Sequence, residues 1–354
     1  MSVVLITAVS RSLGLRLAAQ LAADPTVERV IGIDTAPPRR ADLPLLGRTE
    51  FVRADIRNPL IAQVVSQAGV TTVVHAGLLD GVGSVGGRTS TQEMNVIGTM
   101  QLLAACQKSD TVGRVVLRST TAVYGAGSGD PAVFVEDGPA GDGGLSGYSK
   151  DAAEVEGYVR GFARRRPDVD VTVLRFAPVL GTGADTALGR YLRGPIVPTP
   201  AGFDPRLQLL HESDAVEALR LATVSARPGV VNVAGAGVLS LAQIVRRLGR
   251  LRVPVPGLAL AAAGAVARNA AAAELDAQQA GYLRFGRVVD TTRLLTEFGY
   301  RPAYTTEQTV DAFGNGVPAI PRLGLSVLGV GSDLLHARRS DRATTARRRP
   351  QITV

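Results

Sequence analysis

One segment near the N-terminus has the residue types and the spacing to hold a phosphate, and an acidic residue follows it at a characteristic interval. Residues 7 to 14 (TAVSRSLG) join an apolar run to a helical pattern, and Asp34 stands about 20 residues after Gly14. The N–H groups at the start of a helix bind anions. A carboxylate at Asp34 can accept hydrogen bonds from two ribose hydroxyls, and it repels a 2′-phosphate. The segment therefore predicts a dinucleotide site that favours NAD over NADP.

This turn departs from the glycine pattern that is typical of such sites. The usual fingerprint has three glycines. This chain keeps Gly14, has Ala8 at the first position, and has Arg11 or Ser12 at the second, depending on the alignment. The guanidinium of Arg11 could pair with a pyrophosphate, or with a 2′-phosphate, which would weaken the preference for NAD. A nucleotide-binding fold that has lost its cofactor is therefore the alternative interpretation.

Short apolar runs alternate with helical patterns through the first half of the chain. Strands are expected at residues 3–8, 30–33, 51–53, 72–75, 114–118 and 171–176, and helices at 13–23, 58–69, 92–108 and 146–166. This alternation predicts a doubly wound parallel sheet of the Rossmann type, an α/β fold. Such a sheet binds its ligand at the carboxyl ends of the strands.

After residue 180 the pattern loosens, because glycine and proline become frequent. Helices are expected there at residues 213–223, 240–251 and 258–279. We predict an NAD-binding Rossmann domain over residues 1–180, with the sheet completed by parts of 207–235. A smaller, interleaved substrate-binding lobe would span 181–315, and a basic tail without fixed structure would span 316–354.

The positive charge is concentrated at the C-terminus. The formal net charge is +8, and the segment 338–349 carries Arg338, Arg339, Arg342, Arg347, Arg348 and Arg349. A nucleic-acid-binding protein would instead show basic residues on a folded face with aromatic partners. We therefore expect no nucleic-acid partner and interpret the tail as a solvated segment.

Composition excludes several other classes of protein. Cys106 is the single cysteine, so an intrachain disulfide is impossible and a cytoplasmic location fits. The first ten residues lack the basic start of a signal peptide. The longest apolar stretch, 253–267, is short and interrupted by proline, so no membrane span is expected. His75, His211 and His336 are far apart in the sequence, and we expect no metal site.

A series of short motifs runs in order from about residue 3 to residue 305. They are residues 3–14, 31–34, 54–57 (ADIR), 73–77 (VVHAG), 95–99 (NVIGT), 119–125 (STTAVYG), 136–139 (EDGP), 149–150 (SK), 174–175 (LR), 179–181 (VLG), 211–214 (HESD) and 297–302 (EFGYRP). Each motif alone is weak, but their order is specific. Together they resemble the NAD-dependent epimerase/dehydratase family, which are extended short-chain dehydrogenases/reductases, and in particular the actinobacterial UDP-glucose 4-epimerase-like proteins.

The resemblance implies a cofactor site. Asp55 and Ile56 would flank the adenine, Gly77 and Leu78 would line the cofactor, and Asn95 would brace a strand–helix junction. The implied cofactor-binding residues are Ala8, Arg11, Leu13, Gly14, Asp34, Asp55, Ile56, Gly77, Leu78, Asn95, Lys150 and Pro178. Sugar-nucleotide epimerases usually carry a substrate-binding asparagine where this chain has Pro178.

The resemblance also implies catalytic residues, and here the chain departs from the pattern. Thr120 would hydrogen-bond the reacting hydroxyl or carbonyl, and Lys150 would hold the nicotinamide ribose. A catalytic tyrosine is expected four residues before the lysine, but Ser146 stands there. A serine hydroxyl is a much poorer general base than a phenol beside a lysine. Tyr124 is a possible substitute, with a packed structural role as its plainer interpretation.

These observations leave three functional hypotheses open. The leading one is an enzyme that acts on a nucleotide sugar by transient hydride transfer to NAD, with 4-epimerisation as the first case and Ser146 in a degenerate site. The candidates for binding the substrate phosphates are Arg175, Arg190, Arg193 and Arg206. Of these we predict Arg190 and Arg206 as the substrate-binding residues. The alternatives are an inactive dinucleotide-binding sensor or scaffold and an NAD(P)-dependent reductase or dehydratase.

In similar proteins the helices near 92–108 and 146–166 pack between subunits, which implies a homodimer. The residues at 154 and 156 are both glutamates, which we interpret as a solvated helix face.

Overall fold

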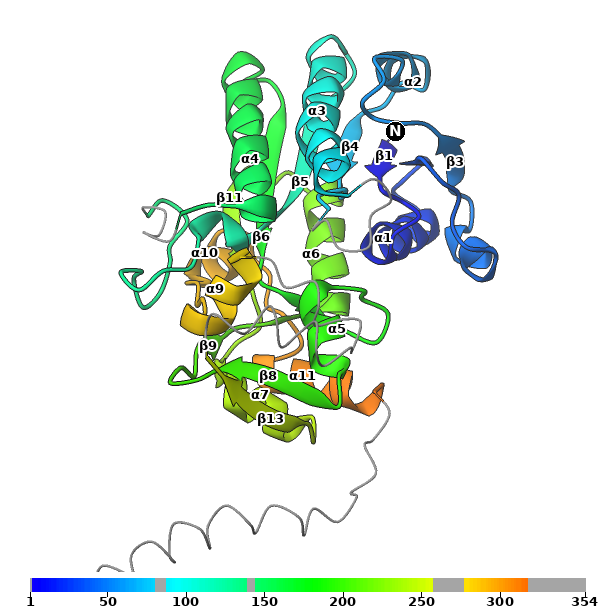
Figure 1. Ribbon diagram of the computed structural model, residues 1–354. Coiled ribbons are helices and arrows are strands. Elements are labelled where there is room, and N and C mark those ends of the chain that lie inside the picture. The colour runs from blue at the N-terminus through cyan, green and yellow to red at the C-terminus, as the bar shows by residue number, and fades with distance from the viewer. Residues whose placement is uncertain (1, 80–86, 139–143, 257–276, 318–354) are drawn as a thin grey trace, which may run out of the picture. The chain divides into compact units, whose positions relative to one another are not determined.

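Seven parallel strands form the central sheet of the computed structural model, which describes residues 2–79, 87–138, 144–256 and 277–317 (Figure 1). The strand order is β11-β6-β5-β4-β1-β2-β3. The strands are β1 (Val3–Thr7), β2 (Arg29–Asp34), β3 (Glu50–Arg53), β4 (Thr72–His75), β5 (Arg114–Thr120), β6 (Asp170–Phe176) and β11 (Gly229–Val233). The winding reverses between β1 and β4, so the ligand edge of a Rossmann sheet lies there. The predicted fold class is confirmed.

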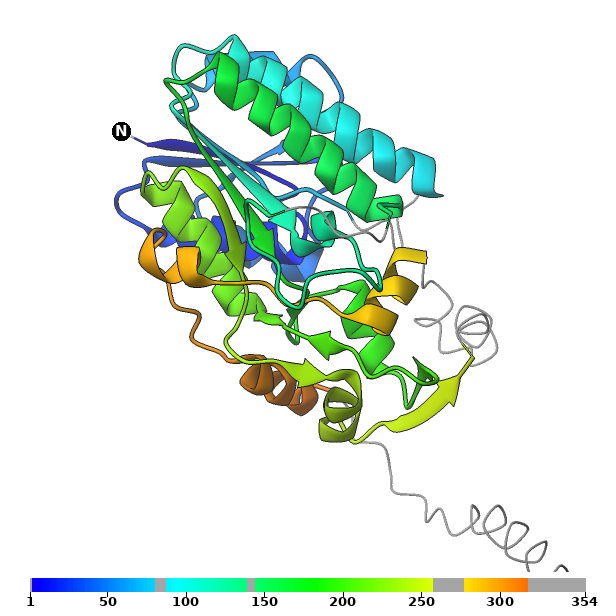
Figure 2. The ribbon, with the colours of Figure 1, turned by 90° about the vertical axis from the view of Figure 1, so that its left-hand side faces the viewer.

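Helices cover both faces of this sheet. On one face lie α1 (Ser12–Ala23) and α6 (Glu212–Val224), which pack on each other. On the other lie α2 (Ile61–Gln67), α3 (Gly87–Gln107) and α4 (Gly147–Arg165), and Figure 2 shows α3 and α4 side by side. All five residues of β1 are buried, as expected for a strand covered on both faces. Among the described residues, no helix is long and apolar enough to cross a membrane.

The first half of the chain also contains two short 3-10 helices, and two of its α-helices begin at residues other than those predicted. The 3-10 helices are η1 (Arg40–Leu46) and η2 (Thr121–Tyr124). The helix expected from residue 58 begins at Ile61, because the Asn58 side chain accepts from the N–H of Leu60 at 3.0 Å and forms a turn first. The helix expected from residue 92 begins earlier, at Gly87.

The second half adds small sheets and a separate hydrophobic cluster. Its elements are β7 (Val179–Leu180), α5 (Ala187–Arg193), β8 (Ile196–Pro200), β9 (Arg206–Leu207), β10 (Leu210–His211), β12 (Leu239–Ser240), α7 (Leu241–Arg247), β13 (Leu251–Val255), α9 (Ala277–Phe285), α10 (Thr292–Thr296) and α11 (Thr306–Asn315). The cluster contains Tyr191, Leu241, Leu283 and Phe313. It is distinct from the larger cluster around the central sheet.

Two expectations for this half differ from the structure. The helix expected over 240–251 ends at Arg247, because Gly249 adopts a left-handed φ of 63° and the chain turns into β13. The helix expected over 258–279 and the tail expected over 316–354 lie almost entirely outside the described residues.

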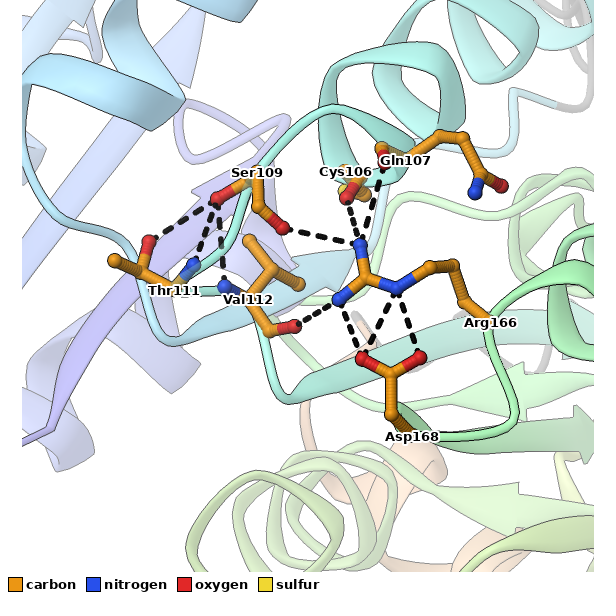
Figure 3. A network of polar contacts seen from close by, with 7 residues as sticks. All are labelled: Cys106, Gln107, Ser109, Thr111, Val112, Arg166 and Asp168. Carbon is orange, nitrogen blue, oxygen red and sulfur yellow. Dashed lines mark hydrogen bonds and ion pairs between the residues drawn. The ribbon is translucent and has the colours of Figure 1, made fainter.

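Arg166 joins the ends of α3 and α4 (Figure 3). Its Nη1 donates to the carbonyls of Cys106 at 2.9 Å, Gln107 at 3.4 Å and Ser109 at 3.0 Å, and its Nη2 donates to the carbonyl of Val112 at 3.4 Å. The last carbonyls of a helix have no partner within the helix. One guanidinium therefore provides hydrogen bonds to backbone carbonyls at the C-terminus of α3 and in the turn that leads into β5. Asp168 orients this guanidinium, accepting from Nη2 at 2.7 Å.

We predict that Arg166→Gln lowers the melting temperature by several degrees, because it removes most of these charge-assisted hydrogen bonds. Thermal denaturation followed by circular dichroism measures the change. Arg164→Gln is the matched control, since Arg164 is an exposed arginine in the last turn of α4, two residues before Arg166. Equal melting temperatures for the two variants would contradict the proposed role of Arg166.

Candidate active site

The close approach of β1 and α1 explains why Gly14 is a glycine. A Cβ at Gly14 would lie 2.3 Å from the carbonyl oxygen of Ala8, which is a backbone clash. Ala8 itself has a φ of 56°, a left-handed conformation that L side chains rarely adopt. Ala8 therefore keeps the backbone shape that a glycine would give, at the expense of local strain.

Asp34 lies at the carboxyl end of β2 beside this turn. Its Oδ2 accepts from the N–H of Ser10 at 3.1 Å, and its Oδ1 accepts from the N–H of Thr35 at 2.8 Å. Ser10 is fixed in turn because its hydroxyl donates to the carbonyl of Ala36 at 2.6 Å. A carboxylate oxygen can accept more than one hydrogen bond. Asp34 is thus held in place by the backbone and can still accept from a pair of hydroxyls.

The start of α1 has further features that suit a pyrophosphate. Arg11 is the N-cap and is exposed, and its own side chain makes no capping bond. The hydroxyl of Ser12 is buried, and it has no hydrogen-bond partner among the described residues. Buried polar atoms are usually satisfied, so this hydroxyl is available for a ligand atom at the helix N-terminus. Leu13 is half-buried against the main core.

The two residues that are expected to flank the adenine, Asp55 and Ile56, already have partners within the protein. Asp55 forms an ion pair of 2.6 Å with Arg57, and hydrogen bonds from Arg57 hold the pKa of that carboxyl below its usual value. Ile56 is buried against Gly98, where a Cβ would come within 2.8 Å of the isoleucine side chain. Asp55 and Ile56 follow β3, one strand beyond Asp34.

A buried histidine at the end of β4 holds the start of the segment that follows this strand. His75 is buried, with Nδ1 2.8 Å from the Thr7 hydroxyl and Nε2 2.9 Å from the Thr99 hydroxyl. Burial lowers the pKa of His75 to about 4, so the ring is neutral at pH 7. His75 therefore acts as a link between β1, β4 and α3. Gly77 lies next to Ala8, and a Cβ there would meet the Ala8 Cβ at 3.3 Å.

Asn95 clamps the same segment with both ends of its amide. Its Oδ1 accepts from the N–H of Leu79 at 2.8 Å, and its Nδ2 donates to the carbonyl of Leu79 at 2.9 Å and to Asp151 at 3.1 Å. Asp151 is fully buried and also binds both Nη atoms of Arg88, each at 2.6 Å. No local pattern indicates a role for Asp151, which follows Lys150 on α4. Leu78, the residue before the clamp, is buried, and its carbonyl accepts from Arg118 at 2.8 Å.

Thr120 and the start of α4 hold the expected catalytic groups. Thr120 ends β5, and its hydroxyl accepts from the N–H of Ala122 at 3.2 Å. Ser146 is the N-cap of α4, and its N–H donates to the Ser149 hydroxyl at 3.1 Å, as in a capping box. The helix expected from residue 146 thus begins at Gly147. Lys150 lies in the first turn with an exposed side chain.

Tyr124 lies in a buried network behind Thr120. Its hydroxyl donates to Asn232 at 2.8 Å and accepts from Arg175 at 2.9 Å. Arg175 also binds Glu156 through Nη2 at 2.7 Å, and Glu156 accepts from the Ser119 hydroxyl at 2.5 Å. Burial raises the pKa of Tyr124 above its ordinary value. These contacts match the structural interpretation of Tyr124.

The network corrects two expectations. Glu156 was expected on a solvated helix face, but it is 2% exposed, because it pairs with Arg175 inside the protein. Arg175 was one of four arginines considered for a substrate phosphate, but Glu156 and Tyr124 occupy its guanidinium. Glu154 is half-buried and accepts from the Tyr158 hydroxyl at 3.2 Å.

The remaining expected residues lie in the second half of the chain. Arg190 on α5 pairs with Asp185 at 2.7 Å, and Arg193 stacks over Phe313. Arg206 is exposed on β9. Pro178 is half-buried after β6, and its carbonyl accepts from the N–H of Leu210 at 3.1 Å.

His211 caps α6, and burial lowers its pKa. Over the described residues, no three His, Cys, Asp or Glu side chains are grouped to hold a metal ion.

The model of one protein family matches residues 4–234, and its description is "NAD dependent epimerase/dehydratase family". The chain belongs to the NAD-dependent epimerase/dehydratase family. An uncharacterized protein of Mycobacterium tuberculosis is 48% identical over 314 residues, which cover 89% of this chain and 84% of that one. A protein of Mycobacterium bovis, also described as uncharacterized, matches equally well.

Solved structures of similar fold are dTDP-glucose 4,6-dehydratase from Bacillus anthracis in complex with NAD and UDP-glucose 4-epimerase from Thermotoga maritima with UDP-glucose. Both have a TM-score of 0.69 and 19% identity. The first covers 89% of this chain and 96% of its own, and the second covers 89% and 98%. At this identity the likeness concerns the fold.

In this member of the epimerase/dehydratase family, the structure brings part of the expected site together at one edge of the sheet. Ala8, Gly14, Asp34 and Gly77 meet at the carboxyl ends of β1, β2 and β4. Thr120 follows at the end of β5, the next strand of the sheet. The sequence does not predict the roles of Arg88 and Asp151, because their partners are distant in the sequence.

The left-handed φ of Ala8 generates a prediction. Ala8→Gly should raise the free energy of unfolding by about 1 kcal/mol, since it relieves the strain of an L residue in this conformation. Urea denaturation measures the change. Ala19→Gly, in the middle of α1, is the control and should lower the free energy of unfolding by about 1 kcal/mol. A loss of stability in Ala8→Gly equal to that of the control would show that the strain is absent.

Proposed function

We propose that this chain is an NAD-dependent enzyme that acts on a nucleotide sugar, with 4-epimerisation as the leading reaction. Membership of the epimerase/dehydratase family supports the reaction class. The observation that carries the proposal is the position of Asp34, which backbone N–H groups hold beside the turn of Ala8 and Gly14. The substrate would lie between the carboxyl edge of the sheet and the lobe that we assign to residues 181–315.

The residues present fit the dinucleotide. Asp34 would accept hydrogen bonds from the adenosine ribose, and the N-terminus of α1 with Ser12 and Arg11 would hold the pyrophosphate. Asp55 and Ile56 would border the adenine, and Gly77, Leu78 and Pro178 would line the nicotinamide side. When bound, NAD would supply reversible hydride transfer for the substrate. The carboxylate of Asp34 disfavours a 2′-phosphate at the same place.

Three residues would then act on the substrate. Thr120 would orient the reacting hydroxyl, and Lys150 would hold the nicotinamide ribose. Ser146, at the N-cap of α4, would move the proton through a water molecule, since Tyr124 is buried and its hydroxyl is bound on both sides. A serine is a weak base, so turnover slower than that of an enzyme with a tyrosine at this place is part of the proposal. Arg190 and Arg206 would bind the substrate phosphates.

The experiment that tests the cofactor is calorimetry with NAD and NADP. We predict that NAD binds and that Asp34→Arg weakens this binding by at least tenfold, because the carboxylate that accepts from the ribose is lost and a cation replaces it. Glu28→Arg is the control, since Glu28 is an exposed acid with the same change of charge. Binding of neither cofactor by the folded protein would contradict the enzyme and favour a scaffold. Binding of NAD without epimerisation, but with net reduction or dehydration, would favour the reductase or dehydratase.

We also propose that α3 and α4 form a subunit interface, as the family resemblance implies. On α3, Ile97 and Met100 are each 44% exposed and lie one turn apart. Large exposed apolar side chains that share a helix face favour an interface. The double variant Ile97→Glu and Met100→Lys should convert a dimer to a monomer at micromolar concentration in sedimentation velocity. Leu60→Lys, at a 56% exposed leucine outside both helices, is the control and should leave the dimer intact.

A further inference from the structure

Arg118 is a charged residue of the central sheet, near the carboxyl end of β5. The side chains of a strand alternate between the two faces of its sheet. Ser119 faces α4, since its hydroxyl donates to Glu156 at 2.5 Å. Arg114 faces the opposite side, since its Nη1 donates to the carbonyl of Thr223 on α6 at 2.7 Å. Arg118 comes four residues after Arg114 and one residue before Ser119, so it lies on the face that α6 covers.

The guanidinium of Arg118 lies at the carboxyl edge of the sheet. Its Nη1 donates to the carbonyl of Leu78 at 2.8 Å and to the carbonyl of Ala76 at 3.4 Å. These two residues flank Gly77, and we assign Gly77 and Leu78 to the nicotinamide side of the cofactor. Thr120, which would orient the reacting hydroxyl, stands two residues further along the same strand. The positive charge is thus fixed beside the segment where hydride transfer would occur.

Among the described residues, no carboxylate forms an ion pair with Arg118. Its side chain is half-buried, and its Nε is buried without a hydrogen-bond partner in this part of the chain. Two other arginines of the sheet do form ion pairs, Arg114 with Asp170 at 3.8 Å and Arg175 with Glu156 at 2.7 Å. An arginine side chain is always charged in proteins. A partly buried charge is also screened less by salt than an exposed one.

The charge of Arg118 acts on one titratable group inside the protein. His75 ends β4, the strand that pairs with β5. Burial lowers the pKa of His75 to about 4, and the positive charge of Arg118 contributes to the same decrease. Arg118 therefore disfavours a second positive charge at this edge of the sheet. A ligand group that gains or loses a positive charge here would be subject to the same repulsion.

The nicotinamide ring changes its charge in the proposed reaction. The substrate carbon would lose a hydride, which carries two electrons, and the substrate hydroxyl would lose its proton to Ser146 through the water molecule. Transfer of the hydride to the oxidised ring, which carries one positive charge, leaves a reduced ring without charge. The oxidised and the reduced dinucleotide therefore differ by one positive charge at the place that Arg118 adjoins.

We propose that Arg118 sets the oxidation preference of the bound dinucleotide, so that NADH binds more tightly than NAD. The inference rests on the proposed function, because it needs the nicotinamide ring at this edge of the sheet. Repulsion from Arg118 raises the free energy of the oxidised ring and acts much less on the neutral one. Lys150 would also lie at this end, but its side chain is exposed and its charge is more strongly screened. The resulting cofactor is more readily reduced, which favours hydride removal where Ser146 is a weak base.

The test is calorimetry of the full chain with NAD, NADH and ADP-ribose, a probe that lacks the nicotinamide ring. Arg118→Gln removes the positive charge, and Arg118→Lys keeps it. Arg114→Gln is the matched control, since Arg114 is a half-buried arginine on the same strand and the same face, at the opposite edge of the sheet. Thermal denaturation of each variant shows whether it is folded.

We expect wild type to bind NADH more tightly than NAD by about tenfold or more. Arg118→Gln should reduce this ratio of dissociation constants about tenfold, because the charge that repels the oxidised ring is lost. Arg118→Lys and Arg114→Gln should keep the ratio of wild type. The dissociation constant of ADP-ribose should be the same in all four proteins, because this probe carries the pyrophosphate without the ring.

An unchanged ratio in folded Arg118→Gln would overturn the inference. Wild type that binds NAD as tightly as NADH would overturn it without any variant. Equal losses of NAD, NADH and ADP-ribose binding in Arg118→Gln would also overturn it, since the charge would then act on the pyrophosphate. In each of these results wild type still binds NAD, so the proposed function stands. Wild type that binds none of the three probes removes the proposed function, and the inference with it.

Discussion

The buried ion pair between Glu156 and Arg175 connects more of this structure than any other contact described above. It joins α4 to β6, it reaches β5 through the Ser119 hydroxyl, and it reaches β11 through Tyr124 and Asn232. Removing one partner of such a pair would leave an uncompensated charge in the interior, which costs several kcal/mol. The pair therefore fixes the helix that carries Lys150 against the strand that ends in Thr120.

A second constraint acts at the other end of the ligand edge, where the backbones of β1 and α1 nearly touch. Gly14 is required because the Ala8 carbonyl occupies the space of a side chain, whereas Ala8 can replace a glycine by adopting a left-handed φ. The two positions of the fingerprint are thus unequal in physical terms. One is a steric exclusion that no rearrangement of a side chain can relieve, and the other is a conformational preference of limited energy.

The sequence predicts the parts of this protein that depend on local pattern. Buried runs such as Val3–Thr7 and the interval from Gly14 to Asp34 lead to the sheet and to one side of the expected site. The sequence did not predict the parts that depend on distant partners. The local pattern predicts a solvated Glu156, because no residue near it in the sequence shows that Arg175 lies beneath it. The predicted end of the helix over 240–251 is wrong for a local reason, since the turn at Gly249 ends the helix and an apolar strand follows.

Ser146 has a structural role at the start of α4 that is separate from its proposed catalytic role. At the N-cap of a helix, serine is among the preferred residues, and a residue that cannot cap costs about 1 kcal/mol. A tyrosine at this place would give up that preference and supply a phenol beside Lys150. The start of α4 is also held by Arg88, which donates to the carbonyl of Gly147 at 2.8 Å and binds Asp151. Since Asp151 in turn contacts Asn95, the helix start that carries Ser146 and Lys150 is tied to the backbone of Leu79. The contacts of Arg88, Asp151 and Asn95 therefore hold the helix start in place independently of the side chain at position 146, which is the arrangement expected if Ser146 faces a bound ligand as proposed.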